Sequence, residues 1–211
     1  MSRRRPYLPA AGWDCLLPLY DPGSRFFGGD AVRSSLLDQM TFEPGQRVLD
    51  IGCATGTLLL LLKHRYPATT VVGLDPDANA LARAREKAHR GGLELQLCRG
   101  FSDGLPFADG SFEHVTCTMM FSLLAFEQKV ATLREVARVL GECGSFHLLD
   151  LVKTPPGSRL WRRLLGPSGG YHVCTEEETI AFMTQAGLNG ARKTGRHPFW
   201  VWPLVSYQAS R

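Results

Sequence analysis

The stretch of residues 47–56 constrains the fold of this 211-residue chain more than any other. It opens with an apolar run broken only by Asp50, continues through small residues, and enters a leucine-rich segment after Gly56. This order predicts a strand, a tight turn and a helix. Gly52 and Gly56 let the backbone turn sharply and let a ligand come close, and the helix that follows directs free N–H groups at the turn.

Two acids define the chemistry of this loop. Asp50 stands at the end of the first strand, where a carboxylate would repel a pyrophosphate but would suit a cationic ligand. Asp75 ends the next apolar run, residues 70–74, and an acid at that place can accept both hydroxyls of a ribose. One acid for a cationic group and another for a ribose together indicate S-adenosylmethionine (SAM).

Four motifs in order resemble the class I SAM-dependent methyltransferases. Residues 48–56, V-L-D-I-G-C-A-T-G, resemble the first motif of that family, and residues 73–76, G-L-D-P, resemble the second. Residues 105–112 and 135–140 resemble segments of the subgroup that includes the quinone-biosynthesis methyltransferases. The resemblance covers residues 20–151 and implies SAM as cofactor and S-adenosylhomocysteine as product. The cofactor-binding residues it implies in the first two motifs are Asp50, Gly52, Cys53, Ala54, Gly56, Asp75 and Pro76.

The chain departs from the family pattern at three places. Ala54 replaces the middle glycine of the first motif and adds a methyl group to the loop. Phe101 stands where the subgroup has an acid, so Ser102 and Asp103 become the expected adenine contacts. Residues 122–123, Ser-Leu, stand where the subgroup has two histidines, which leaves open a methyltransferase-like scaffold without catalysis.

Strand and helix patterns alternate in the order of a doubly wound fold. The predicted strands are residues 46–51, 70–74, 93–98, 112–119 and 144–151, and two closing antiparallel strands are residues 189–194 and 201–208. The predicted helices are residues 30–40, 55–66, 77–90, 127–140 and 175–186. This alternation predicts an α/β fold with a mostly parallel sheet, seven-stranded in the family resembled, and helices on both faces. The ligand would then lie at the carboxyl ends of the first two strands.

We expect the chain to form a single domain of residues 1–211. Residues 1–40 would supply an arm, a flap and a helix, residues 41–151 the SAM-binding core, and residues 152–211 a substrate-side segment and a closing hairpin. Prolines at positions 18 and 22 predict that residues 13–27 are irregular, either as a flap over the ligand or as packing outside the sheet. Tyr20 and Asp21 match a Tyr-Asp pair of the subgroup, which makes Tyr20 a pocket candidate.

Composition argues against several other classes. The chain has 24 basic and 20 acidic residues, and the resulting net charge of +4 is too weak to predict nucleic-acid binding. None of the six cysteines forms a C-x-x-C pair, so we expect no metal site and reduced thiols. No signal peptide and no apolar stretch long enough to cross a bilayer is visible. We therefore expect a cytoplasmic monomer or homodimer that has no more than weak contact with a membrane surface.

The end of the fourth predicted strand carries an apolar pair, Met119 and Met120. Both lie beside the expected methyl position, where they would suit a hydrophobic acceptor or the adenine face, although they can equally be core residues. We assign Met119 to the cofactor and Met120 to the acceptor. Tyr171 and His172 follow a glycine-rich turn in a segment that should reach over the site, so both are acceptor candidates.

A catalytic residue is not identified by the sequence. His172 is the candidate general base, and Asp150 and His197 are weaker candidates. Methyl transfer from a sulfonium is an in-line displacement, in which holding two reactants in line can supply roughly 7–11 kcal/mol of the barrier. A methyltransferase therefore does not require an obvious catalytic pair.

The predicted function is methyl transfer from SAM to a small, apolar or aromatic acceptor. The chain lacks the Asn/Asp-Pro-Pro-Tyr/Phe motif after its fourth strand, which argues against methylation of DNA adenine. Methylation of a phospholipid amine is an alternative, suggested by basic residues at positions 159, 162 and 163 beside Trp161. A non-catalytic binding protein and a dehydrogenase-like nucleotide binder are two others, and Asp50 argues against the last.

Overall fold

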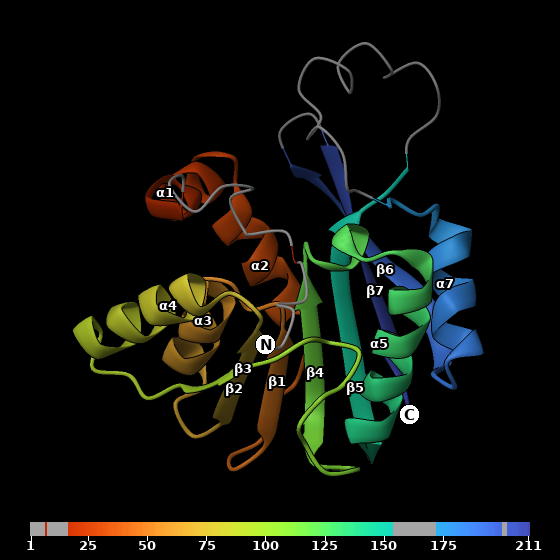
Figure 1. Cartoon of the computed structure of the whole chain (residues 1–211), viewed down its shortest axis with the longest axis horizontal. Helices are drawn as coiled ribbons and strands as arrows, with labels where there is room; N and C mark the ends of the chain where they lie inside the picture. The colour runs from red at the N-terminus through yellow and green to blue at the C-terminus, as the bar shows by residue number, and fades with distance from the viewer. Residues whose placement is uncertain (1–6, 8–16, 154–171, 200–201) are drawn as a thin grey trace, which may run out of the picture.

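The computed structural model describes residue 7 and residues 17–153, 172–199 and 202–211 (Figure 1). The helical elements are α1 (Leu17–Phe26), α2 (Gly29–Leu37), α3 (Thr57–Arg65), α4 (Ala78–Arg90), the 3-10 turn η2 (Phe121–Leu123), α5 (Phe126–Val139) and α7 (Glu176–Gln185). The strands are β1 (Arg47–Ile51), β2 (Thr70–Asp75), β3 (Gln96–Arg99), β4 (Phe112–Thr118), β5 (Leu140–Leu151), β6 (Asn189–Phe199) and β7 (Trp202–Ser210). Each predicted strand and helix is present, with ends that differ by a few residues.

The strands form one seven-stranded sheet in the order β3-β2-β1-β4-β5-β7-β6 (Figure 1). The first five strands in this order pair in parallel, whereas β7 runs antiparallel between β5 and β6. The chain order reverses between β1 and β4, and in such sheets ligands bind outside the carboxyl ends of the strands at that point. The predicted fold class, a doubly wound and mostly parallel sheet, is confirmed.

Side chains that alternate along the strands build two hydrophobic clusters, one on each face of the sheet. Leu49 and Ile51 of β1 belong to the cluster that includes residues of α5 and α7. Val48 of the same strand belongs to the other cluster, which includes residues of α2, α3 and α4. Because successive strand residues point to opposite faces, Asp50 shares the face of Val48.

The β4–β5 pairing contains a register shift that exposes one cysteine. Phe112 pairs with Leu140, and the next pair joins His114 to Ser145, so the β5 residues between them bulge out of the ladder. Cys143 lies in this bulge and is exposed.

The prediction of an irregular segment before α2 is wrong for residues 17–26, which form the helix α1 with Pro22 inside it. The backbone then breaks at Gly28, whose φ of 85° is left-handed, and α2 begins at Gly29. The polar contacts that α1 makes with the rest of the protein, described below, offset the hydrogen bond that Pro22 cannot donate.

The carboxyl-terminal elements follow the prediction closely. Thr175 caps α7 by accepting a hydrogen bond from Glu178 N at 3.1 Å, and the Glu178 side chain accepts one from Thr175 N at 2.8 Å. The helix thus begins with a capping box. Within the residues that the structure describes, no helix is both long and apolar enough to span a membrane.

Candidate functional site

The loop after β1 folds back on the end of β2. The N–H groups of Gly52 and Cys53 donate to the Leu74 carbonyl at 2.8 and 3.1 Å. Gly52, Ala54 and Gly56 have φ angles of 72°, 47° and 73°, which are all left-handed. The left-handed region costs a residue with a Cβ roughly 1–2 kcal/mol. Ala54, which stands where the family pattern has glycine, therefore adopts a backbone form that favours glycine, at some cost in strain.

Both glycines of this loop are required for space as well as for backbone angle. A Cβ on Gly52 would lie 2.5 Å from Met120 Cγ, and a Cβ on Gly56 would lie 2.9 Å from the Cβ of Ala84. The Met120 side chain thus packs directly on the loop, and α4 packs directly on the start of α3. The Cys53 side chain is buried, so it reaches the core rather than the loop surface.

Asp50 is buried at the carboxyl end of β1, with 1% of its surface exposed. Its Oδ1 accepts a hydrogen bond from Thr116 Oγ1 of β4 at 2.8 Å, whereas its Oδ2 has no partner among the described residues. Burial raises the pKa of Asp50 to about 7, although the Thr116 hydrogen bond and the nearby charge of Arg33 act in the opposite direction. A buried carboxylate oxygen without a donor is costly, and a cationic group beside it would offset that cost.

Asp75 holds the loop in place from the end of β2. Its Oδ2 accepts a hydrogen bond from Ala54 N at 2.8 Å, and its Oδ1 accepts one from Asp77 N at 2.8 Å. Burial raises the pKa of Asp75 to about 6 despite these two hydrogen bonds. Each carboxylate oxygen has a second acceptor site, so the group can still accept from two hydroxyls.

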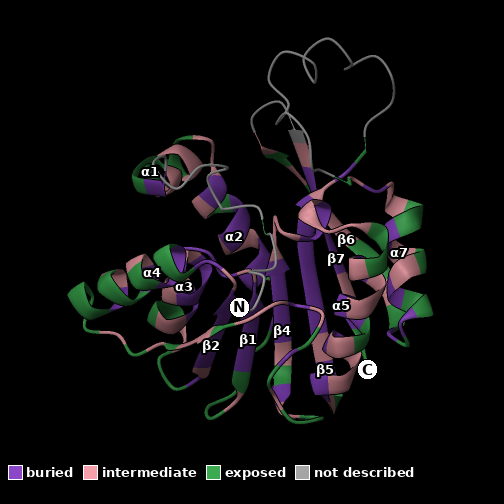
Figure 2. Cartoon of the chain, in the orientation of Figure 1, coloured by how far each residue is buried: buried purple, intermediate pink, exposed green. Residues whose placement is uncertain are grey.

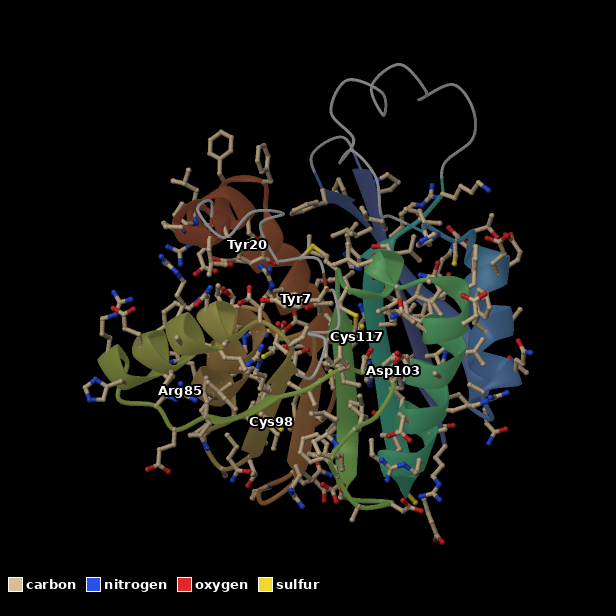
Figure 3. The ribbon with its side chains drawn as sticks, in the orientation of Figure 1. Tyr7, Tyr20, Arg85, Cys98, Asp103 and Cys117 are labelled. Carbon is tan, nitrogen blue, oxygen red and sulfur yellow. The ribbon has the colours of Figure 1, made fainter. Side chains whose placement is uncertain are left out.

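Two residues of the first two helices face these acids, and only one of them was predicted. Tyr20 lies on α1 above the carboxyl ends of the strands (Figure 3), and burial raises the pKa of its phenol above the ordinary value. Arg33 of α2 is 4% exposed and donates to Ser24 Oγ at 3.0 Å. The positive charge of Arg33 acts to lower the pKa of both Tyr20 and Asp50, but the effect of burial is larger and both pKa values are raised. Arg33 was not predicted from the sequence, although an arginine in the apolar pattern of a predicted helix was a signal for it.

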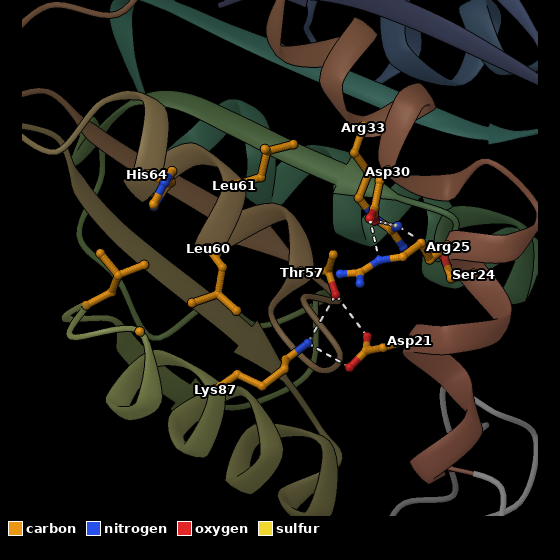
Figure 4. A pocket seen from close by; sticks show the side chains of 12 residues that line it. Asp21, Ser24, Arg25, Asp30, Arg33, Thr57, Leu60, Leu61, His64 and Lys87 are labelled. Atoms are coloured by element: carbon orange, nitrogen blue, oxygen red, sulfur yellow. Dashed lines mark hydrogen bonds and ion pairs between the residues drawn. The ribbon is translucent and has the colours of Figure 1, made fainter.

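A polar cluster ties α1 to the glycine loop (Figure 4). Asp21 Oδ1 accepts hydrogen bonds from the hydroxyls of Thr55 at 2.6 Å and Thr57 at 2.9 Å. Asp21 Oδ2 accepts a hydrogen bond from Lys87 Nζ of α4 at 2.8 Å. Burial acts to raise the pKa of Asp21, but the hydrogen bonds from Lys87 and the two threonines bring it below its ordinary value.

A cavity of about 400 Å³ lies on the outer side of this cluster (Figure 4). Its lining includes Asp21 and Lys87 together with Leu60 and Leu61 of α3. It includes none of the acids and glycines at the ends of β1 and β2, so this cavity lies beside the predicted cofactor site and is separate from it.

The segment after β4 is held by buried polar groups. Met119 has a left-handed φ of 54°, and its N–H donates to the Leu149 carbonyl at 2.7 Å. The buried Lys129 side chain donates to the carbonyls of Phe121 and Leu124. These contacts fix the turn η2 and with it the two methionines at the end of β4.

Asp150 supports the same turn. Its Oδ2 accepts from Ser122 N at 2.9 Å and its Oδ1 from Leu151 N at 2.6 Å, and the residue is 3% exposed. Its carboxylate is therefore engaged with the backbone, and the geometry does not favour Asp150 as a base. His197 lies near the carboxyl end of the edge strand β6, three strands from β4 in the sheet, where its ring hydrogen-bonds to Ser206 Oγ at 3.1 Å.

The structure brings one acceptor candidate to the end of β4. His172 N donates to the Ser122 carbonyl at 2.7 Å, and the His172 ring lies 5.8 Å from the Phe126 ring. The exposed side chain of His172 thus stands beside the place where the subgroup has its histidine pair. Tyr171 lies outside the described residues.

The two adenine candidates lie in the turn that follows β3 (Figure 3). Ser102 is buried, and its hydroxyl pairs with Thr132 Oγ1 at 2.7 Å. Asp103 lies next to it and is partly exposed. The carbonyl of Pro76 accepts a hydrogen bond from Arg99 Nε at 3.0 Å, which joins the ends of β2 and β3.

These residues fit the cofactor that the motifs imply. Asp50 Oδ2, which has no hydrogen-bond partner within the described parts of the chain, is a place for a cationic group, and Asp75 can accept from ribose hydroxyls. The left-handed glycine loop leaves room for close approach of a ligand. The structure therefore brings the predicted cofactor residues of the first two motifs to one edge of the sheet.

Comparison with known proteins gives the same family. Residues 48–144 match the family model described as a methyltransferase domain. A demethylmenaquinone methyltransferase of Thermus thermophilus is 36% identical over 146 residues, which cover 68% of this chain and 66% of that protein. The uncharacterized methyltransferase YodH of Bacillus subtilis is 32% identical over 165 residues, which cover 78% of this chain and 68% of that protein.

The fold is shared with solved methyltransferase structures. The crystal structure of a SAM-dependent methyltransferase from Aquifex aeolicus has a TM-score of 0.70 at 18% identity, covering 94% of this chain and 99% of that chain. With the sequence relatives, this removes the dehydrogenase-like alternative. The chain therefore belongs to the class I SAM-dependent methyltransferases, the family that its first two motifs resemble.

Proposed function

We propose that this enzyme transfers the methyl group of SAM to a small apolar or aromatic acceptor, of the kind that a hydroquinone ring presents. The observation that carries the proposal is the contact between Met120 and Gly52. The Met120 side chain occupies the space directly beside the loop glycine. The surface next to the glycine loop, here called the apolar wall, is therefore formed by a thioether. A thioether offers no strong hydrogen bond to a polar acceptor but packs well against an aromatic ring.

Other side chains near this wall support an apolar acceptor. Phe126, the first residue of α5, stacks at 6.0 Å on Phe182 of α7, and His172 lies against it. The relative from Thermus thermophilus is named a demethylmenaquinone methyltransferase, and a menaquinone precursor is an apolar aromatic molecule. Both observations favour a ring carbon or a ring hydroxyl over an alkylamine as the acceptor.

The proposed cofactor contacts are divided among three parts of the site. Asp50 would face the cationic part of SAM, Asp75 would accept from the ribose, and Ser102 and Asp103 would lie near the adenine. When bound, SAM supplies a methyl group activated by its sulfonium. Met119, whose left-handed backbone turns the chain at the end of β4, would line the cofactor side of the wall.

Tyr20, Met120, Tyr171 and His172 are the proposed acceptor contacts. Tyr20 is the one whose phenol is buried next to Arg33, so it can donate a hydrogen bond to an acceptor oxygen. His172 remains the candidate base because its ring is exposed beside Phe126. His172→Gln would lower turnover of a phenolic acceptor and leave binding of the product S-adenosylhomocysteine unchanged.

We further propose a cytoplasmic location. The cysteines in the described parts of the chain are free thiols, which suits a reducing compartment.

The test is a methyl-transfer assay with labelled SAM and three acceptors: a naphthohydroquinone, a catechol and phosphatidylethanolamine in vesicles. We expect label in the hydroquinone or the catechol. Met120→Gln should raise the KM of that acceptor about tenfold, since a polar group would replace the apolar wall. Met40→Gln, at a buried methionine outside the site, should lower thermal stability without raising this KM.

The other outcomes identify the alternatives. Label in phosphatidylethanolamine alone would replace the proposed acceptor with a phospholipid amine. Micromolar binding of S-adenosylhomocysteine with no turnover of any acceptor would favour the non-catalytic binding protein.

A further inference from the structure

Helix α1 has its polar side inward. Leu17, Tyr20, Asp21 and Ser24 follow one another at helical spacing, and all four are buried or half-buried. Three of them are polar, and they face the charged cluster around Arg33 described above. An ordinary surface helix turns its apolar stripe inward and its polar side to water.

The outer face of α1, formed by Pro18, Leu19, Pro22 and Phe26, is apolar and exposed. Leu19 is 65% exposed and Phe26 is 84% exposed. Leu19, Pro22 and Phe26 stand at positions i, i+3 and i+7, so they form one stripe along the helix. In Figure 2, α1 carries exposed residues on the side that faces away from the sheet.

This outer face lies at the edge of the molecule where the cofactor site opens. Asp21 on the opposite side of α1 contacts Thr55 and Thr57, which begin α3 directly after the glycine loop. A further exposed aromatic, Phe126 at 47%, follows the turn after β4 and so lies at the same edge (Figure 1). Exposed apolar side chains therefore gather at the edge through which an apolar acceptor would enter.

Basic residues lie on α1 and on the nearby helix α4. Arg25 is 78% exposed, and its 3.0 Å pair with Asp30 is a surface pair that leaves the guanidinium accessible. Helix α4, which pairs with α1 through Lys87 and Asp21, carries four basic residues and one acid, and Arg90 is exposed at its end. Three further arginines, Arg3, Arg4 and Arg5, precede α1 in the sequence and lie outside the described residues. An apolar stripe with basic neighbours matches a lipid surface that carries negative charge.

The outer face of α1 is too small to hold two copies of the chain together. A stable protein interface buries about 800 Å² on each partner. One large aromatic side chain contributes about 150–250 Å², and the outer face of α1 has only Phe26 of that kind. A bilayer has no such threshold, because each apolar side chain that enters it contributes separately.

We propose that the outer face of α1 docks this enzyme on an anionic bilayer surface, with Leu19 and Phe26 inserted among the lipids and the basic residues near the headgroups. Docking places the opening of the site at the level where an apolar acceptor dissolved in the bilayer resides. The docking is reversible, because two inserted side chains and a few charges bind a membrane far more weakly than a spanning helix does. It does not depend on which acceptor is methylated.

The test is flotation of the full chain with vesicles of phosphatidylcholine alone or mixed with phosphatidylglycerol. We expect flotation with the anionic vesicles, a smaller bound fraction in pure phosphatidylcholine, and release at high salt. The variant Leu19→Asp/Phe26→Asp should lose at least about tenfold in apparent affinity. Leu19→Ser/Phe26→Ser should lose nearly as much, which separates the loss of apolar surface from the added charge.

The matched control is Ala181→Asp/Gln96→Asp, which adds the same charge at exposed positions on α7 and β3. This control should float like the parent chain. All variants should bind S-adenosylhomocysteine with unchanged affinity, which shows that they are folded and keeps this test separate from that of the acceptor.

Three results would overturn the proposal. The first is that the parent chain does not float with anionic vesicles, and the second is that the α1 variants float as well as the control. The third is a dimer, seen by sedimentation velocity, that the α1 variants dissociate, because the outer face of α1 would then serve a second copy of the chain.

Discussion

Asp21 of α1 accepts a hydrogen bond from Lys87 Nζ of α4 at 2.8 Å, and these two residues are 66 positions apart in the chain. The Lys87 ammonium also lies 3.2 Å from Thr55 Oγ1 and 3.1 Å from Thr57 Oγ1. Four side chains from α1, the glycine loop, α3 and α4 thus form one closed cluster. Through it, the position of α1 over the strand ends is coupled to the shape of the loop that we propose binds the cofactor.

Replacing Asp21 should weaken cofactor binding without direct loss of a cofactor contact. Asp21→Ala leaves the Lys87 ammonium and two hydroxyls without their acceptor and frees α1 from the loop. We expect S-adenosylhomocysteine affinity to fall about tenfold and stability to fall by about 1–2 kcal/mol, the small value reflecting a partly exposed ion pair. Calorimetric titration and urea unfolding measure the two effects.

Asp38 provides the control for this variant. Its carboxylate pairs with Arg65 at 2.7 Å on the surface, away from the loop. Asp38→Ala should change stability by no more than about 0.5 kcal/mol and leave the affinity unchanged. Equal effects of the two variants on affinity would refute the coupling between α1 and the loop.

SAM affinity should rise with pH between about pH 6 and pH 8. Burial raises the folded-state pKa of Asp50 to about 7, so at pH 6 most of the ligand-free protein carries the neutral carboxyl. A cation binds the ionised form better, so binding at pH 6 must first remove a proton. We expect about a tenfold gain in SAM affinity from pH 6 to pH 8, and proton release on binding.

The stability of the ligand-free protein changes with pH in the opposite direction to the SAM affinity. A carboxyl with a raised folded-state pKa contributes stability at low pH that is lost as the pH rises through about 7. The rise in melting temperature caused by SAM should therefore be larger at pH 8 than at pH 6. In Asp50→Asn both the proton release and this difference should shrink, and a pH profile identical to that of the parent chain would show that another group is responsible.

His147 should make the folded state sensitive to mild acid. It is 1% exposed on β5, its Nε2 pairs with Ser145 Oγ at 2.9 Å, and burial lowers its pKa to about 4. A base with a lowered folded-state pKa contributes stability above the unfolded value near 6.5 and loses it as the pH falls toward 4. The difference between the unfolded and folded pKa values corresponds to about 3 kcal/mol in the free energy of unfolding.

Urea unfolding at pH 7.5 and pH 5.0 tests this role of His147. His147→Gln should lose less stability than the parent chain between the two pH values, because it lacks the histidine that must take up a proton. The buried acids act in the opposite direction, but they are common to both proteins and cancel in the comparison. His64→Gln, at an exposed position on α3, should follow the parent chain. If His147→Gln shows the same acid sensitivity as the parent chain, buried His147 is not its source.

The sequence predicted the strand ends and therefore the acids that stand there. Asp50 and Asp75 each end an apolar run, and parallel strands bring their carboxyl ends to one edge, so local patterns were sufficient. Thr116 was missed because its contact with Asp50 depends on the register between β1 and β4, and many polar residues occupy strands without such a contact.

Helix α1 shows why local rules failed elsewhere. Pro18 and Pro22 predicted an irregular segment, but Asp21 finds partners on α3 and α4 that no local pattern reveals. Lys87 was missed for the same reason, since one lysine in a basic helix looks like any other solvated charge. Contacts between distant segments decided the structure where the local preference of the chain was weak.

Gly52 should be the least replaceable glycine of the loop. Its φ of 72° is left-handed, and a Cβ there would lie 2.5 Å from Met120 Cγ, so alanine meets both strain and a collision. We expect Gly52→Ala to cost about 2–4 kcal/mol in stability and to abolish measurable S-adenosylhomocysteine binding. Gly45→Ala is the matched control, because Gly45 has a φ of 85° but no atom within 4 Å of the added Cβ. It should cost only about 1–2 kcal/mol and leave binding intact.

The collision can be separated from the strain by shortening its partner. In Gly52→Ala/Met120→Ala the 2.5 Å collision with Met120 Cγ is removed and only the 2.8 Å approach of the Cβ at position 120 remains. The double variant should therefore recover part of the cofactor affinity although it lacks the rest of the Met120 side chain. Urea unfolding and calorimetric titration of the four proteins in this cycle give the coupling between the two positions, which we expect to be about 1–2 kcal/mol in favour of the double variant. Strictly additive effects would mean that Met120 does not pack on the loop in solution, and the apolar wall on which the proposed acceptor depends would then be absent.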